Sequence, residues 1–472
     1  MLAKKLSPRS RRSRRSQRSK RRSNISCRRP RRSPQRFVDC LRYFLTPALW
    51  KQALHVRQAA RVCRSSRWLL QPLVLVLLFM TWCGGDAQPE RFETAKAFCI
   101  ACLPKRRRPG KTVQGFQKAL AQLPAAVLRL LGESLRQTLA QRLAKRCYEG
   151  EFIPIGCDGS RVECPRSTEL EQRLGQAGKE QTAPSIWVTA LVLLRLGVPW
   201  AWRIGKGTAS ERGHMEQMVA CLPAAALLVA DAGFVSFALA KRIMQAKRHF
   251  LIRMSSIATF YTETRVRLRR YREGVVYYWP QKAQNAGELP LELRLIRIRA
   301  KKKKNDVWLL TNVMESSRLT IAMAGQYYRW RWENEGQFRA YKLTLDKMKL
   351  VSRTVRLVHR EAEGSLLAMQ LMLAQGALAM PRRTPTGEPR VCSPRKVLLT
   401  IREEIKEKML KRHRCYWQRL RQAERERRPR TSAKARRVWP RRKPHRTPKP
   451  PKIRMLSARQ KARIFQLQRL IA

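Results

Sequence analysis

The chain has 472 residues, and its 102 lysines and arginines against 32 acidic residues give a formal net charge of +70 at pH 7. No compact fold needs this excess, and repulsion between like charges opposes it, so a polyanionic partner is expected. Nucleic acid fits better than an anionic membrane surface, because each neutralised phosphate releases counterions and adds affinity.

The N-terminal part divides into two segments. Residues 1–36 are almost entirely Arg, Ser, Lys and Pro, so we expect a disordered arm that binds nucleic acid or only raises nonspecific affinity. Residues 37–148 carry apolar residues at steps of three and four, most clearly over 116–150. This spacing predicts a helical N-terminal domain.

The most apolar run, residues 68–82, is shorter than the about 20 residues that a membrane-spanning helix needs. We interpret it as a buried helix and expect no membrane partner. The twelve cysteines have no regular spacing, and the single C-x-x-C of Cys99 and Cys102 has no second pair to complete a zinc site. Free thiols predict a cytoplasmic protein, and the charge predicts association with the nucleoid.

Residues 149–380 alternate between strand-like and helix-like patterns, which predicts an α/β fold. We expect a β-rich insertion at about 257–312. The expected elements are a strand ending at Asp158, a helix and then a strand over 182–205, an apolar run within 224–234 that leads to Asp231, a strand over 248–256, and helices over 317–348 and 350–380.

The tail, residues 381–472, is again basic and rich in proline. We expect one charged helix near 394–427 and a second near 457–472. Ser457 and Gln460 have the spacing of a capping box at the start of the second helix. Between the two helices, residues 427–452 are expected to be unstructured.

Two aspartates stand out because the chain has only six. Asp158 and Asp231 each follow an apolar run and precede a small residue. Ligands of open α/β sheets bind beyond the carboxyl ends of the strands, so two carboxylates there would face one site. A divalent ion with oxygen ligands, such as Mg²⁺ or Mn²⁺, removes their repulsion. The alternative is that each is an ordinary turn aspartate at a strand end.

The segment YYRWRWENEGQFRAYK, residues 327–342, combines aromatic and charged residues. At about 100° per residue, Arg331, Glu335 and Lys342 fall at about 300°, 340° and 320° from Tyr328, so the four share one helical face. Glu333 lies about 160° from Glu335 and leaves that face. A carboxylate among cations and a phenol suits a metal site with an anionic substrate. The alternative is an i,i+4 ion pair between Arg331 and Glu335 on a surface helix.

These residues resemble a known family. Tyr328, Arg331, Glu335 and Lys342 match the Y-R-E-K signature of bacterial insertion-sequence transposases of the insertion-sequence-4 group, which are DDE enzymes. The segments CDGS, VADAGF, HFLIRM and DVWLLTN resemble the family's other blocks in the same order. The resemblance covers about residues 150–375. The long basic arm and the Pro-rich tail are not part of the family's common pattern.

The resemblance implies a ribonuclease-H-like catalytic core with a β-rich insertion. It implies that Asp158, Asp231 and Glu335 are catalytic and hold two divalent metal ions, Mg²⁺ or Mn²⁺, for phosphoryl transfer. Cleavage at transposon ends and strand transfer into target DNA would follow, within a homodimer that forms a synaptic complex. The DNA-contacting residues would be Tyr328, Arg331 and Lys342, with Arg253 and Trp308 as weaker candidates, and for Trp308 a place in the core is the favoured interpretation. The helical domain of residues 37–148 would bind the DNA ends.

A second hypothesis is a basic DNA- or RNA-binding protein without catalysis, including a decayed transposase. The first hypothesis is favoured because a chain with few acids has both aspartates and the complete signature. Intact residues alone do not establish activity.

Overall fold

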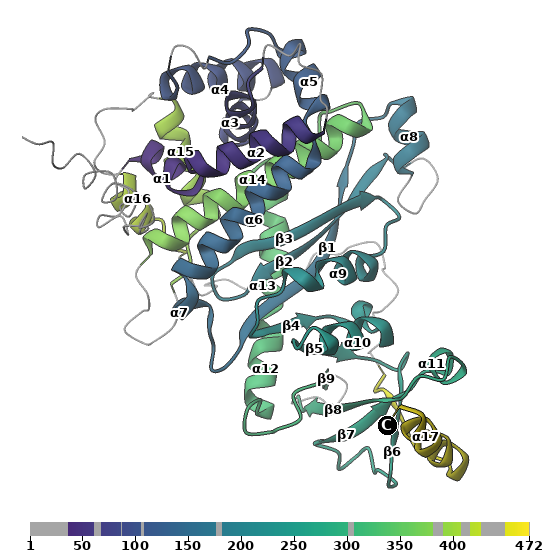
Figure 1. Ribbon diagram of the computed structural model, residues 1–472. Helices are drawn as coiled ribbons and strands as arrows, with labels where there is room; N and C mark the ends of the chain where they lie inside the picture. The colour runs from purple at the N-terminus through teal and green to yellow at the C-terminus, as the bar shows by residue number, and fades with distance from the viewer. Residues whose placement is uncertain are drawn as a thin grey trace, which may run out of the picture.

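The computed structural model describes residues 36–60, 68–85, 87–104, 108–175, 182–300, 306–380, 390–406, 416–425 and 449–471. The expected N-terminal arm, apart from residue 36, and the expected unstructured stretch up to residue 448 lie outside these ranges. The described chain is a mixed α/β structure with one large sheet. The N-terminal helices lie at one end of it, and the C-terminal helix lies beside the strands at the other end (Figure 1).

The N-terminal part of the described chain is helical. Its helices are α1 (Phe37–Phe44), α2 (Pro47–Ala59), α3 (Leu70–Trp82), α4 (Gln88–Cys102), α5 (Val113–Gln122), α6 (Ala125–Arg142) and α7 (Ala144–Cys147). Helix α3 is apolar all round and is buried on nearly every side, as its sequence predicts. Of the helices in the described ranges, none combines the length and apolar character that crossing a bilayer requires.

These helices share their core with helices from the C-terminal half. Helix α14 (Val355–Ala379) packs against α3, α5 and α6, while α15 (Pro394–Lys406) and α16 (Tyr416–Gln422) pack against α14. Gly364 allows α14 to approach α3, because a Cβ there would lie 2.4 Å from a methyl carbon of Leu77. The indole N–H of Trp82 donates to the carbonyl of Ala368 at 3.2 Å. This hydrogen bond joins α3 to a residue 286 positions later in the chain, so the N-terminal helices pack on the C-terminal half.

The described strands form one ten-stranded sheet in the order β10-β6-β7-β8-β9-β5-β4-β1-β2-β3. The strands are β1 (Ile153–Glu163), β2 (Ser185–Leu193), β3 (Val198–Lys206), β4 (Ala226–Ala230), β5 (His249–Met254), β6 (Thr259–Thr262), β7 (Glu273–Tyr278), β8 (Leu291–Ile298), β9 (Val307–Thr311) and β10 (Lys452–Met455). Strands β1, β4 and β5 are parallel to one another, and β2 and β3 continue the sheet as an antiparallel hairpin.

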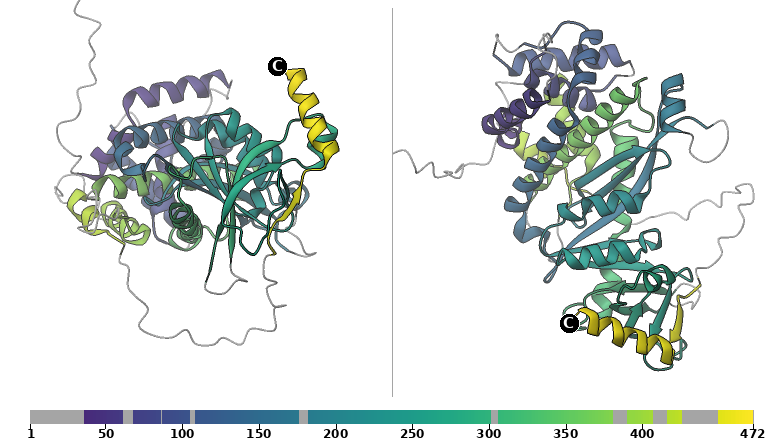
Figure 2. Two further views of the ribbon diagram at one scale, coloured as in Figure 1. Left: turned by 90° about the horizontal axis from the view of Figure 1, so that it is seen from below. Right: turned by 45° about the vertical axis from the view of Figure 1, so that its right-hand side comes forward.

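Apolar side chains cover both faces of the sheet. Leu228 and Ala230 of β4 belong to the large core that includes helices α9 (Glu211–Met218) and α10 (Phe237–Gln245). Leu227 and Val229 belong to a second core with helix α12 (Ile321–Trp330). Successive side chains of a strand point to opposite faces, so this alternation shows β4 buried on both sides. Figure 2 gives two further views of the layers.

Two local expectations were wrong. Residues 182–205, expected to begin with a helix, form the hairpin of β2 and β3. Periodicity alone does not separate a fully buried strand from a buried helix, and here the hairpin is buried on both faces. Strand β1 does not end at Asp158 but continues to Glu163, because β2 pairs with it along that whole stretch.

The segment expected as one long helix over 317–348 is interrupted. Helix α12 ends at Trp330, α13 runs over Trp332–Arg339, and a π-helical turn, η5, covers Ala340–Thr344. A π turn closes i→i+5 hydrogen bonds, as the Leu345 N–H does with the carbonyl of Ala340 at 3.0 Å. Angles calculated for a continuous α-helix therefore do not apply beyond residue 339.

The tail returns to the sheet. Strand β10 pairs in parallel with β6, and α17 (Ala458–Ile471) follows it. The first residue of β10, Lys452, is the last residue of the stretch that was expected to be unstructured. The predicted capping box is confirmed, because the Gln460 N–H donates to the Ser457 hydroxyl at 3.2 Å and the Ser457 N–H donates to the Gln460 side chain at 3.1 Å. The remaining helical segments are α8 (Thr168–Leu174), η2 (Val219–Cys221), η3 (Ala232–Phe234) and α11 (Gln281–Asn285).

Candidate active site

The first feature of the site is the register between two parallel strands. Gly156 of β1 lies opposite Val229 of β4. Two residues further along each strand, Asp158 and Asp231 therefore stand at the same level, where β4 ends. The parallel pairing brings the two aspartates together at the carboxyl edge, where α/β sheets bind their ligands.

Each aspartate is held by a local backbone hydrogen bond. Oδ1 of Asp158 accepts from the N–H of Gly159 at 2.9 Å, and Oδ1 of Asp231 accepts from the N–H of Gly233 at 2.8 Å. The second bond caps η3, which is the turn geometry that the alternative interpretation of Asp231 predicts. Within the described residues, the second oxygen of each carboxylate makes no hydrogen bond, so both oxygens remain available to a ligand.

The pKa of Asp158 shows which charges surround it. Burial raises this pKa, and the charges of Asp231 and Glu335 raise it further. The N–H of Gly159 and the guanidinium of Arg331 lower it, but the net shift is upward from the ordinary value. Asp231, Glu335 and Arg331 are therefore all within electrostatic reach of Asp158.

Glu335 is the most exposed of the three expected carboxylates, with 48% of its side chain exposed. Its Oε1 lies 3.8 Å from Nη2 of Arg331, so the i,i+4 pair of the alternative interpretation is present as a loose contact. Arg331 itself is only 9% exposed. Its Nε and the hydroxyl of Tyr328, which is 8% exposed, have no hydrogen-bond partner among the described residues. Two buried donors are thus left for a ligand to satisfy.

Lys342 lies in the π-helical turn rather than on a continuous α-helix. Burial lowers its pKa below the ordinary value, while the charge of Glu163 acts in the opposite direction. The ammonium group is thus partly desolvated and within electrostatic reach of Glu163, the last residue of β1. Such a position suits contact with a negatively charged ligand, because a partly desolvated charge attracts it more strongly.

The two other expected DNA contacts lie on neighbouring strands. Arg253 of β5 is half-buried and pairs with Leu309 of β9. Trp308 is 6% exposed, and its ring lies 5.4 Å from that of Tyr271 and 5.3 Å from the guanidinium of Arg297. In this structure Trp308 packs in the core and does not present its ring to solvent.

Glu211 is a fourth acidic residue at this edge, and the sequence analysis did not select it. It is the first residue of α9, after the cap residue Ser210. Burial raises the pKa of Glu211 to about 7, and the charges of Asp158 and Asp231 contribute to the same shift. The sequence signal for Glu211 was an acidic residue directly after a capping serine, in a chain with few acids. The long separation between Glu211 and Asp158 in the sequence gave no sign that the two lie close together.

The donor set fits a divalent cation that prefers oxygen. Asp158, Asp231, Glu211 and Glu335 offer carboxylate oxygens, which Mg²⁺ and Mn²⁺ prefer over sulfur ligands. A Cβ at Gly159 would lie 2.2 Å from Oε1 of Glu211, so the absence of a side chain there opens space for the carboxylate. No three His, Cys, Asp or Glu side chains in the described ranges already stand in a metal-binding arrangement.

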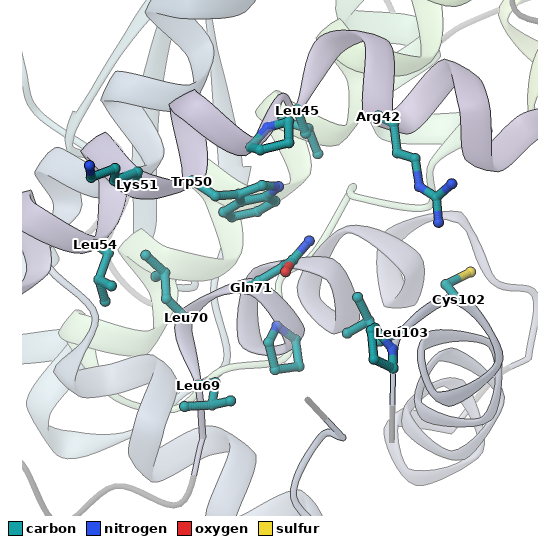
Figure 3. A pocket seen from close by; sticks show the side chains of 13 residues that line it. Arg42, Leu45, Trp50, Lys51, Leu54, Leu69, Leu70, Gln71, Cys102 and Leu103 are labelled. Carbon is teal, nitrogen blue, oxygen red and sulfur yellow. The ribbon is translucent and has the colours of Figure 1, made fainter. Parts of the chain in front are cut away.

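A cavity of about 610 Å³ lies apart from these residues, in the helical layer (Figure 3). Leu45 and Trp50, from the start of α2 and the turn before it, line it together with Leu69, Leu70 and Leu103. Its walls are mainly apolar, and the carboxylates of the sheet edge are not among them. Arg42 and Lys51 also line it, but no Asp or Glu does, so its lining lacks carboxylate ligands for a divalent cation.

The sequence profile of the family described as "Transposase DDE domain" matches residues 157–371. The match begins one residue before Asp158 and includes Asp231 and Glu335, and it supports a DDE transposase family. Among solved structures, a piggyBac transposase in a synaptic complex with hairpin DNA is 11% identical, with 80% of this chain and 83% of that chain covered and a TM-score of 0.40. No curated protein matches the chain.

Proposed function

We propose, from the premise that residues 157–371 match the transposase DDE domain, that this protein is a DNA transposase that cuts transposon ends and joins them to target DNA. The observation that carries the proposal is the register of β1 and β4, which sets Asp158 level with Asp231 inside the matched region. The order β3-β2-β1-β4-β5, with β1, β4 and β5 parallel, supports a ribonuclease-H-like core.

Asp158, Asp231 and Glu335 are the proposed ligands of two divalent ions, Mg²⁺ or Mn²⁺. When bound, such ions supply an activated oxygen nucleophile and stabilise the leaving oxygen of a phosphodiester. The chain's own residues position the DNA. The buried donors of Tyr328 and Arg331 would hydrogen-bond phosphate oxygens, and charge-assisted bonds to phosphate are the stronger kind.

The remaining part of the proposal concerns the assembly. Lys342 and Arg253 would contact the DNA backbone, and the formal net charge of +70 provides a strong nonspecific attraction to DNA. Two element ends must be handled together, so we propose a homodimer in a synaptic complex, acting in the cytoplasm at the nucleoid. Membership of the insertion-sequence-4 group belongs to this proposal and rests on the Y-R-E-K signature.

The deciding experiment uses the DNA that flanks this gene. Terminal inverted repeats are identified in the flanking DNA and synthesised as duplexes. These duplexes are incubated with the full-length protein and Mg²⁺. We expect nicking at the repeat ends and, with added plasmid, joined products. Retention of the duplex without nicking, by a chain that binds the repeats, would favour the second candidate, a DNA-binding protein without catalysis. The loose Arg331–Glu335 contact is the observation that favours this candidate.

A further inference from the structure

We infer that Glu211 is a fourth carboxylate ligand of the divalent-cation site, reaching it from the face of the sheet opposite to α13. This inference rests on the proposed function, because it assumes that Asp158 and Asp231 hold the cation. It adds a residue from a segment, the start of α9, that the Y-R-E-K signature and the two aspartate blocks do not include.

The contacts around two glycines place the Glu211 carboxylate. Oε1 lies 2.2 Å from the position that a Cβ of Gly159 would occupy, directly after Asp158. Oε2 lies 4.0 Å from the corresponding position at Gly233, whose N–H holds Asp231. One oxygen of Glu211 is therefore beside the Asp158 strand, and the other is beside the Asp231 turn. Any larger residue at position 159 would occupy the space that this carboxylate fills.

The two faces of β1 receive different helices. Asn334 of α13 meets Gly156, with a side-chain atom 2.4 Å from the position of a Cβ there. Gly159, three residues later, faces the opposite side of the strand, and α9 supplies Glu211 to that side. Glu335, on α13, and Glu211 therefore approach the aspartate pair from opposite faces of the sheet. Carboxylates on both sides of the pair can fill coordination positions of a cation that ligands from one face alone would leave empty.

Glu211 itself makes no hydrogen bond and no ion pair among the described residues, although it is half-buried next to two aspartates. Carboxylates at such a place repel one another. The charge of Arg161 offsets this repulsion at Glu211 only in part, because burial and the two aspartates still raise its pKa. A cation between them reverses the sign of that interaction.

A second observation at the same place points to a ligand. Arg331 is 9% exposed, its charge acts on Asp158, and its Nε has no hydrogen-bond partner in the described part of the chain. The indole N–H of Trp187 is also buried without a partner and lies 2.6 Å from the Cβ position of Gly159. Buried donors without partners beside carboxylates are expected where an anion and a cation bind together, as a phosphodiester and its divalent ion do.

The test measures binding of Mn²⁺ to the full-length chain after removal of metals, by the electron paramagnetic resonance signal of the free ion, at mildly alkaline pH. Glu211→Gln keeps the size of the side chain and removes its charge. Glu216→Gln, on the same helix, is the matched control. We expect Glu211→Gln to weaken Mn²⁺ binding by about tenfold or more, and Glu216→Gln to leave it unchanged. Circular dichroism of each variant checks that the fold is retained.

The outcomes separate this inference from the proposed function. Glu335→Gln is measured in parallel. Weakened binding in Glu335→Gln but wild-type binding in Glu211→Gln overturns the role of Glu211 and retains the proposed site. Weakened binding in Glu211→Gln alone removes Glu335 from the ligands and retains Glu211. A wild-type chain without saturable Mn²⁺ binding overturns both.

A second measurement needs no variant. Fe²⁺ is added to the metal-free wild-type chain in place of Mn²⁺, together with ascorbate and peroxide. The hydroxyl radicals that form cleave the backbone next to the bound iron. We expect cuts around residues 158, 211 and 231. Cuts around 158 and 231 without any near 211 would contradict the inference. Cuts that avoid all three places would overturn the proposed site as well.

Discussion

The backbone N–H of Arg195 donates to Oε2 of Glu333 at 2.7 Å, which fastens the turn between β2 and β3 to α13. Arg195 has φ = 76°, its guanidinium lies 4.2 Å from the ring centroid of Trp330, and its Nε lies 3.2 Å from Oε1 of Glu149. Glu333 is thus engaged in a structural contact, whereas Glu335, two residues later, is exposed. The two glutamates of residues 327–342, the signature segment, therefore have different environments.

Glu335→Gln tests this division. If Glu335 is a metal ligand, we expect loss of Mg²⁺-dependent cleavage of end duplexes with DNA binding largely retained, because a neutral amide binds the ion far more weakly than a carboxylate. Glu333→Gln is the matched control and should keep its cleavage activity, since the amide oxygen still accepts from Arg195. The readouts are gel-based nicking and filter binding. Cleavage by Glu335→Gln at the wild-type rate would remove Glu335 from the site.

Lys342→Ala tests the contact with the DNA backbone. Removing one phosphate contact should weaken binding of an end duplex and lower the slope of log K against log salt concentration by about one. Lys282→Ala, an exposed lysine on α11, is the control and should leave the slope unchanged. The measurement is fluorescence anisotropy over a range of salt concentrations. Equal slopes for wild type and Lys342→Ala would exclude this backbone contact.

Glu211 predicts how the stability of the metal-free protein changes with pH. Its pKa is raised from 4.5 to about 7, by burial first and by Asp158 and Asp231 next. The folded state therefore holds this proton more tightly than the unfolded state does. The stabilisation is complete below about pH 4.5 and is lost as the pH rises through about 7.

Glu211→Gln removes this dependence. Relative to wild type, we expect the variant to gain about 1 kcal/mol between about pH 4 and about pH 8, a value reduced from the full shift because solvent screens the half-buried group. Urea unfolding with a chelator present measures the free energy of unfolding of both proteins. A difference between them that does not change with pH would contradict the prediction.

A buried ion pair next to the signature segment predicts a larger effect. Nζ of Lys347 lies 2.9 Å from Oε1 of Glu361, and the two side chains are 8% and 9% exposed. Glu361 also accepts from the N–H groups of Val351 and Ser352. Lys347→Met leaves a buried carboxylate without its cation, so we expect a loss of about 3–5 kcal/mol of stability.

The double variant Lys347→Met with Glu361→Gln should recover part of this loss, because no unpaired charge remains. Urea unfolding of both single variants and the double variant completes the cycle. If the two single effects simply add, the two residues are not coupled and the pair does not stabilise this region.

Asn334 predicts a gain in stability. It is fully buried, and neither its amide nitrogen nor its amide oxygen has a hydrogen-bond partner among the described residues. A buried polar group without a partner costs about 1–3 kcal/mol, so Asn334→Leu should raise the free energy of unfolding by about 1–2 kcal/mol. Thermal unfolding measures it. A lower melting temperature would show that Leu does not fit against Gly156, or that Asn334 is satisfied in solution.

The sequence by itself determined the features that depend on neighbouring residues. The buried helix α3 follows from an apolar run that is too short to cross a bilayer, and the capping box of Ser457 and Gln460 follows from their spacing. The strand that leads to Asp231 follows from five apolar residues in succession. These features are local, because a few consecutive side chains set the conformation of their own backbone.

Only the tertiary structure decided the rest. Residues 185–193 are a strand rather than a helix, because pairing with β1 and β3 provides hydrogen-bond partners for their backbone groups while both faces are buried. The tertiary structure interrupted the signature segment after Trp330 and ended it in a π turn. Long-range packing also sets Glu211 beside Gly159 and Gly233, across 52 and 22 positions of the chain. Such proximity depends on how strands and helices pack, which no local pattern contains.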